Sequence, residues 1–186
     1  MKTPSLALTV LLAACASSST TEPRSAGDVR AGAATQADGE VVAVLSTIDH
    51  GEIEQGRLAQ SNATDEAVRE FGSRMVSMHT EASARMSALA RQQGISPTES
   101  GESRSVAAAG MSVQQTLQGM RGADFDRAYI DAQVTQHAEA LQKIDQTLIP
   151  RARNEALRSA LRDDVRPMVA SHLERAREIQ SRLRGS

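Results

Sequence analysis

The 186-residue sequence contains very few aromatic residues: no Trp, one Tyr and two Phe, or 2% of the chain. A hydrophobic core must therefore be built from Leu, Ile, Val, Met and Ala, which suits packed helices better than a sheet. Basic residues are scattered, and the formal net charge is only −2. We therefore expect no nucleic-acid partner, because such binding needs concentrated positive charge and stacking aromatic side chains.

The sequence also lacks the motifs that mark common enzyme sites. It has no Gly-x-Ser-x-Gly turn, no phosphate-binding loop, no Gly-rich dinucleotide turn and no pair of cysteines. These absences leave enzymatic activity undecided and favour a non-enzymatic role. No catalytic or cofactor-binding residues are predicted.

The N-terminus has the pattern of a secretory signal. A basic residue, Lys2, precedes an apolar run from Leu6 to Leu12 that is too short to span a bilayer permanently. The tetrad Leu12-Ala13-Ala14-Cys15 resembles a bacterial lipoprotein signal, in which the cysteine carries lipid, palmitate included, and becomes the first mature residue. We predict a lipoprotein signal peptide over residues 1–14 and lipidation of Cys15.

Lipidation of Cys15, the only cysteine, also explains why an exported protein has one unpaired thiol. Ala16 follows the cysteine, and in lipoproteins of this kind the resemblance then favours the outer membrane. We therefore predict a protein that is lipid-anchored in the bacterial cell envelope and faces the periplasm. The predicted partner is the membrane, which the protein would contact through lipidated Cys15. An ordinary signal peptide with an incidental cysteine is the alternative.

The rest of the chain divides into a tether and a helical domain. Residues 15–40 are rich in Ser, Thr, Ala and Gly without periodicity, which predicts a flexible tether. Residues 41–184 carry apolar residues at helical spacing. The predicted helices cover 41–61, 65–93, a weaker segment at 103–120, one that begins near 124, and 155–183. This order predicts an all-α fold, a four-helix bundle of two helical hairpins with a long connection.

Capping and breaking residues set the expected helix ends. Thr64 or Asp65 is expected to cap the second long helix, and Asp124 the third. Gly94 is expected to end the second helix. Pro167 lies inside the last helix, where its missing N–H predicts a kink.

Four stretches resemble one bacterial family, catalogued as domain of unknown function 4142 and often labelled predicted outer-membrane protein. The stretches are "GEIEQGRLA" (51–59), "FGSRMVSMHTEASARM" (71–86), "FDRAYIDAQVTQHAEAL" (125–141) and "RPMVASHLERA" (166–176). The resemblance covers residues 41–183 and implies a ferritin-like bundle and an exported location, without an established activity. The chain departs from the family pattern at Met78, where an acidic residue is common, and at His50, where small residues are usual.

Four histidines, one for each predicted long helix, are the candidate site residues. His137 and His172 lie on apolar seams, His79 lies one residue outside its seam, and His50 points elsewhere. Glu52 is the polar residue on the stripe of the first helix. A bundle core could therefore receive Glu52, His79, His137 and His172 as ligands for Zn, Cu or Fe.

Two observations oppose a compact metal site. No Glu lies three residues before any histidine, so the Glu-x-x-His pair of ferritin-type di-iron sites is absent and ferroxidase activity is disfavoured. His137 lies fifteen residues before the turn near Ala152 and His172 twenty after it, which predicts an axial offset of roughly 7 Å. A weaker alternative uses Met75, Met78 and His79 as soft ligands for copper.

The leading interpretation is that His137 and His172 are core-edge histidines hydrogen-bonded across the bundle, since buried polar groups need partners. The candidate partners are Tyr129, Asp131, Asp163 and Asp164. The predicted function is a lipid-anchored envelope protein of undefined molecular activity with a structural, stress-related or interaction role. A partner protein or a second copy is possible, and no cofactor is expected. The alternatives are an envelope protein that binds a transition metal, and general acid–base catalysis.

Overall fold

The computed structural model describes residues 26–185, and every regular element in this range is helical. The predicted signal peptide 1–14, Cys15 and the first part of the predicted tether lie outside the described residues. The elements are α1 (Ala26–Asn62), α2 (Glu66–Gln92), α3 (Gly101–Gln118), α4 (Gly122–Lys143), η1 (Ile144–Leu148), α5 (Ile149–Arg151), α6 (Glu155–Ala160), η2 (Leu161–Val165) and α7 (Arg166–Gly185). The predicted all-α class is confirmed.

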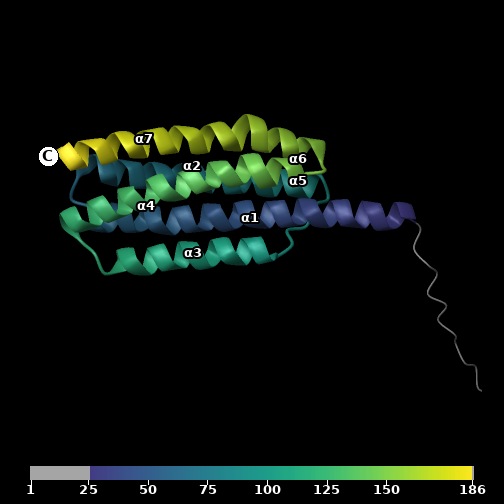
Figure 1. The fold of residues 1–186 in the computed structure, drawn as a ribbon, viewed down its shortest axis with the longest axis horizontal. Coiled ribbons are helices and arrows are strands. Elements are labelled where there is room, and N and C mark those ends of the chain that lie inside the picture. Colours follow the sequence, from purple (N-terminus) through teal and green to yellow (C-terminus); the bar gives the residue numbers. More distant parts are fainter. Residues whose placement is uncertain (1–25, 186) are drawn as a thin grey trace, which may run out of the picture.

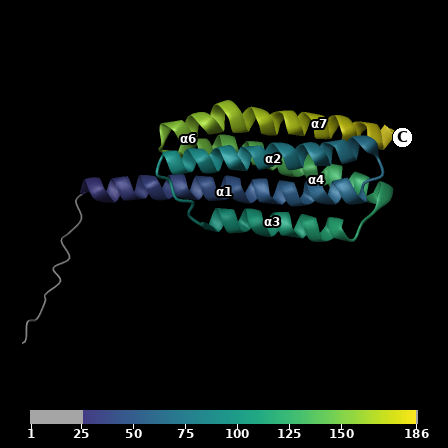
Figure 2. The same cartoon turned by 180° about the vertical axis from the view of Figure 1, so that it is seen from behind.

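Four long rods form the bundle, and α3 lies outside it (Figures 1 and 2). The rods are α1, α2, α4 continued by η1 and α5, and α6 continued by η2 and α7. α1 packs against α2 and α3, while α4 packs against α7. The segment predicted as weak is thus a full fifth helix of 18 residues beside α1. None of the described helices is long and apolar enough to cross a membrane.

α1 begins at Ala26, well before the predicted start at residue 41, and its first turns extend beyond the end of the bundle (Figure 1). The predicted tether 15–40 therefore overlaps this helix. Contacts from distant segments hold its later part in place. Asp38 is buried and accepts hydrogen bonds from the backbone N–H groups of Arg153 and Asn154 in the loop between α5 and α6.

Side-chain caps explain several helix ends. Asp65 caps α2 by accepting from the N–H of Val68 at 3.2 Å, as expected. Gly94, with φ of 65°, follows the last turn of α2. The expected cap at Asp124 is wrong: α4 begins at Gly122, and Asp124 pairs with Arg127 on the surface instead.

The two π-helical segments each end two residues before a proline. η1 precedes Pro150 and η2 precedes Pro167, and the residue before each proline donates its N–H to the carbonyl five residues earlier. A proline has no N–H to donate to the preceding turn, and a π-helical segment is one way in which a helix accommodates a disturbed hydrogen-bond ladder. The last rod therefore runs on past Pro167 to Gly185.

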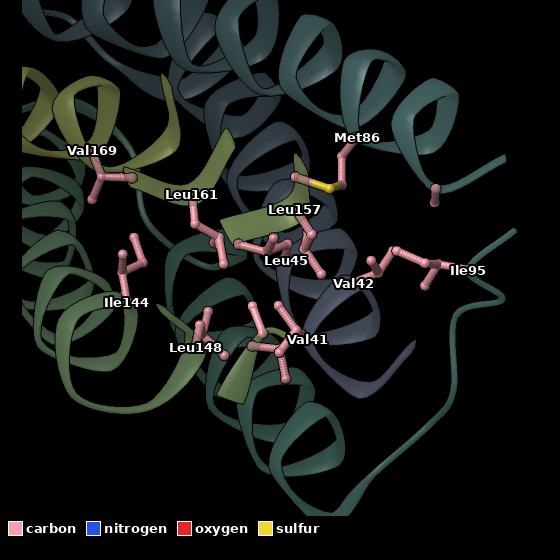
Figure 3. Close-up of a cluster of buried hydrophobic side chains, with 13 residues drawn as sticks. Val41, Val42, Leu45, Met86, Ile95, Ile144, Leu148, Leu157, Leu161 and Val169 are labelled. Atoms are coloured by element: carbon pink, nitrogen blue, oxygen red, sulfur yellow. The ribbon is translucent and has the colours of Figure 1, made fainter. Parts of the chain in front are cut away.

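Two apolar clusters fill the bundle, one toward each end. The first, called the Leu45 cluster, includes Val41, Leu45, Met86, Ile144, Leu148, Leu157, Leu161 and Val169. Figure 3 shows several of these side chains gathered between the helices. The second, called the Phe71 cluster, includes Ala59, Val68, Phe71, Met75, Phe125, Tyr129, Ile130, Ala176 and Ile179.

A layer of buried polar residues separates the two clusters along every rod. We call it the polar layer. Its members are Asp49, Glu52 and Gln55 of α1, His79 of α2, Gln133 and His137 of α4, and His172 of α7. Burial of polar groups between apolar clusters is unfavourable unless each group finds a partner. The chain nevertheless places such residues at the same level of all four rods.

Candidate metal centre

Three imidazoles meet in the middle of the polar layer. His79, His137 and His172 come from α2, α4 and α7, and their exposed fractions are only 1%, 2% and 1%. One ring nitrogen of each lies within 4.8 Å of the corresponding nitrogens of the other two. The ring centroids are 6.1 Å apart for His79–His137 and 5.4 Å for each of the pairs with His172.

The predicted axial offset between His137 and His172 is therefore wrong for the side chains. In a helix each side chain leans toward its own N-terminus. α4 runs toward the turn near Ala152 and α7 runs away from it, so His137 leans away from that turn and His172 leans toward it. The two rings approach each other although their Cα atoms are placed at different distances from the turn.

His79 is oriented by a carboxylate that is not among the site residues predicted from the sequence. Its Nδ1 lies 2.8 Å from Oδ1 of Asp49, which is buried on α1. A carboxylate only accepts, so Nδ1 carries the proton, and in the neutral ring Nε2 has the lone pair. Asp49 comes four residues after Leu45 and three before Glu52, so helical spacing alone could have placed it on the inner stripe.

His137 is oriented in the same sense by its own helix. Its Nδ1 lies 3.0 Å from the backbone carbonyl of Gln133, which can only accept. Nδ1 is therefore the protonated nitrogen and Nε2 the one with the lone pair. Among the described residues, Nε2 of His79, Nε2 of His137 and both ring nitrogens of His172 are buried without a hydrogen-bond partner.

Burial and charge set the protonation of the three rings differently. Burial lowers the pKa of His172 to about 3, helped by the neighbouring His137 and His79. Burial also lowers the pKa of His137, although the charge of Glu52 opposes this shift. For His79, burial favours the neutral ring, but the hydrogen bond to Asp49 and the charges of Glu52 and Asp49 outweigh it and raise the pKa.

Glu52 borders the site but does not converge with the three ligand nitrogens. It is buried, and its Oε1 lies 3.9 Å from Nδ1 of His137, on the side away from the ring's lone pair. Its Oε2 accepts from Nε2 of Gln133 at 2.9 Å. His50 is exposed, as expected from its position on α1.

The partners predicted for His137 and His172 are not their partners in the structure. Asp131 accepts from Gln180 and Arg184 on the surface, and Asp163 and Asp164 are exposed. The Tyr129 hydroxyl is buried, with no partner among the described residues. The interpretation of hydrogen bonds across the bundle is therefore wrong for these two histidines.

The predicted copper ligands are divided between different surroundings. Met75 belongs to the Phe71 cluster, and Met78 is only half-buried. His79 alone of the three belongs to the converging set.

The arrangement of the rings fits a single metal ion. Zn–N bonds of 2.0–2.1 Å in tetrahedral geometry place the ring centroids of two bound imidazoles about 5 Å apart, close to the observed 5.4–6.1 Å. Outer hydrogen bonds from metal-bound histidines to a carboxylate or a backbone carbonyl are the usual second layer of such sites. Asp49 and the Gln133 carbonyl occupy these positions.

The family model described as "Domain of unknown function (DUF4142)" matches residues 23–179. The chain belongs to this family. The matched range includes all three converging histidines, Asp49 and Glu52. Neither a comparison with curated proteins nor one with solved structures found a match. In this DUF4142 domain the carboxylate that holds the His79 imidazole is Asp49 of α1.

Proposed function

We propose that this DUF4142 domain binds one divalent transition-metal ion in its core, through Nε2 of His79, Nε2 of His137 and one ring nitrogen of His172. One observation carries the proposal: lone pairs from three helices converge in a buried space without hydrogen-bond donors among the described residues. Unsatisfied buried acceptors are unfavourable. A cation at their centre satisfies all three at once.

The charges around the rings support a divalent ion. Asp49 and Glu52 are both buried beside the histidines. Two carboxylates can balance the two positive charges of the ion, and a buried charge is tolerated when it is paired or coordinated. Three imidazoles with neutral ring nitrogens and no thiolate suit Zn, Cu, Fe or Ni, whereas Mg²⁺ and Ca²⁺ prefer oxygen ligands.

Three protein nitrogens leave room for a fourth ligand. In zinc enzymes a three-ligand site keeps an open position for water or substrate, while structural sites are closed by four protein ligands. Glu52 also borders the site, but it faces the Nδ1 side of His137. The chain's residues therefore hold the metal, and the fourth position remains available to water.

Metal content of tag-free protein, purified without chelator, tests the proposal. We expect about one metal ion per chain by elemental analysis, and loss of that ion in a His137→Ala/His172→Ala double variant. The matched control is His50→Ala, because His50 is exposed and outside the site. Wild-type protein that takes up no stoichiometric Zn²⁺, Cu²⁺ or Co²⁺, or a double variant that binds as well as the wild type, would contradict it.

We also propose that the domain works in the bacterial envelope as a lipid-anchored protein. The support is the N-terminal sequence, with its short apolar run and the Leu-Ala-Ala-Cys tetrad that ends at Cys15. Cys15→Ser should move the protein from the membrane fraction to the soluble fraction of the envelope. Cys15→Ser protein that stays in the membrane fraction would refute the anchor and leave the metal site unaffected.

A further inference from the structure

A cavity of about 490 Å³ lies between α1, α3 and α4. Its walls are mainly apolar and include Ile48, Val106, Val113 and Ala140. Sites for small molecules have volumes in this range and combine apolar walls with a few polar groups. The outer wall is α3, which lies alongside α1 outside the four long rods (Figure 2). The fifth helix thus creates a compartment that the bundle alone would lack.

Two glycines line this cavity. Gly51 of α1 and Gly110 of α3 both line it, and a Cβ atom on either would meet no heavy atom within 4 Å. Glycine inside a helix lowers stability relative to alanine, and no close contact demands it at these two positions. Gly72, by contrast, touches α1 so closely that a Cβ would lie 2.5 Å from Ala59. Larger side chains at Gly51 and Gly110 would therefore extend into the cavity.

The polar groups of the cavity are predominantly acidic. Glu52 is a buried carboxylate of its wall, and Glu139 is an exposed one at its edge. The remaining charges of the wall are already paired: Lys143 with Glu102 and Asp131 with Arg184. In the metal-free protein, a ligand that enters this space meets the carboxylate of Glu52, which accepts a hydrogen bond from Gln133 but pairs with no Lys or Arg side chain among the described residues.

An amide also faces this space without a partner. Gln136 lines the cavity, and its Nε2 is buried with no hydrogen-bond partner among residues 35–185. An amide nitrogen donates, so it needs an acceptor atom, which an ammonium group does not supply. The cationic part of a ligand therefore binds to Glu52 and not to this amide.

We propose that the cavity between α1, α3 and α4 binds a small organic cation with an apolar or aromatic body and one ammonium group that faces Glu52. The apolar walls bury the body, and the carboxylate selects the charge. This site is separate from the metal centre, since none of the three converging histidines lines the cavity. Glu52 lies between the two sites and contacts both.

Tryptamine is a suitable probe because the chain has no Trp, so indole fluorescence reports only the probe. We expect tryptamine to bind saturably to full-length protein in the presence of chelator, with a blue-shifted emission. Indole-3-propionate has the same ring and a similar chain but a negative charge, and it should bind at least about tenfold more weakly. The chelator makes the result independent of the metal site.

Two variants test the charge of Glu52 and the volume of the cavity separately. Glu52→Gln keeps the size of the side chain and should weaken tryptamine binding by about tenfold or more. Gly51→Leu/Gly110→Leu should fill the cavity and abolish binding while the protein remains folded by circular dichroism. Gly101→Leu is the matched control, because it adds the same side chain on α3 outside the cavity.

The possible outcomes decide the proposal. Saturable tryptamine binding that is lost in the filled variant and weakened by Glu52→Gln supports it. It is overturned by no saturable binding up to the solubility of tryptamine, by equal affinity for indole-3-propionate, or by unchanged binding in the filled variant. None of these results depends on the metal content of the protein, which is measured separately.

Discussion

His79 and Asp49 form the best-defined contact of the polar layer at the scale of single residues. Their hydrogen bond of 2.8 Å joins α1 and α2 and fixes which nitrogen of the ring faces the other histidines. Burial raises the pKa of Asp49, whereas its contact with His79 lowers it. A metal ion on the other side of the ring would strengthen this contact, because the bound imidazole becomes a better donor.

Asp49→Asn should therefore lower the affinity for Zn²⁺ by about 10–100-fold, the usual effect of removing a carboxylate behind a metal-bound histidine. Asparagine keeps the shape and one acceptor oxygen, so the fold should persist. Competition with a chromogenic chelator at neutral pH measures the affinity. Asp163→Asn, an exposed carboxylate on η2, is the control. Equal affinities for Asp49→Asn and the wild type would show that Asp49 does not support a ligand.

The metal-free protein should lose stability in mild acid because of His172. Its ordinary pKa is 6.5 and its folded pKa is about 3, because of burial and the nearby His137, His79 and Arg74. At pH values between these two pKa values, the ring binds a proton in the unfolded chain but not in the folded one. The free energy of unfolding therefore falls as the pH falls. The full loss is about 5 kcal/mol. The lowered pKa of His137 acts in the same direction and the raised pKa of His79 in the opposite one.

Urea unfolding with chelator present, at neutral pH and at successively lower pH, measures this loss. His172→Gln removes the titrating ring and should flatten the dependence, whereas His50→Gln should leave it unchanged. A His172→Gln curve parallel to the wild type would contradict the assignment.

At the scale of elements, α1 and α2 approach each other closely at two glycines. A Cβ on Gly72 would lie 2.5 Å from the Cβ of Ala59, and one on Gly56 would lie 2.7 Å from the carbonyl oxygen of Gly72. These glycines let the two helices approach at the level next to the polar layer. The approach helps to bring His79 of α2 to Asp49 of α1.

Gly72→Ala should lower the free energy of unfolding by about 1–3 kcal/mol, because the added methyl group forces two helices apart. Gly110→Ala is the control on an open helix face and should raise stability by about 0.5–1 kcal/mol. Chemical denaturation of both variants measures the two changes. A neutral Gly72→Ala would mean that α1 and α2 are not held so closely.

The elements differ in how far the sequence predicts them. α2 begins and ends within a residue of its prediction, because its apolar residues and its cap at Asp65 are local signals. α3 looks weak because only Ser103 and Leu117 of it are buried. The part of α1 around Asp38, predicted as tether, contacts the loop at 153–154, and no local pattern reports such contacts.

At the scale of the whole molecule, the polar layer is the feature that the separate helices do not reveal. Helical spacing identifies His137 and His172 as inner residues, but their convergence depends on the opposite lean of side chains on antiparallel helices. Which nitrogen of His79 and of His137 is left without a partner depends on Asp49, from another helix, and on the Gln133 carbonyl, one turn before His137. The Leu45 and Phe71 clusters pack on either side of this layer.

Metal binding to this layer should stabilise the whole domain. Zn²⁺ at about 100 times its dissociation constant should add about 2.7 kcal/mol to the free energy of unfolding, since the ion binds only the folded state. Thermal unfolding with and without Zn²⁺ measures this, and excess chelator should reverse it. His172→Ala protein should show no such increase, and an equal increase in that variant would place the ion elsewhere.

X-ray absorption spectroscopy of the Zn²⁺-loaded protein tests the metal centre most directly. We expect nitrogen or oxygen neighbours at about 2.0–2.1 Å with the outer-shell scattering of three imidazoles, unchanged in His50→Ala. A spectrum with six oxygen neighbours and no imidazole scattering, or a wild-type spectrum retained in His79→Ala, would contradict a site built from His79, His137 and His172.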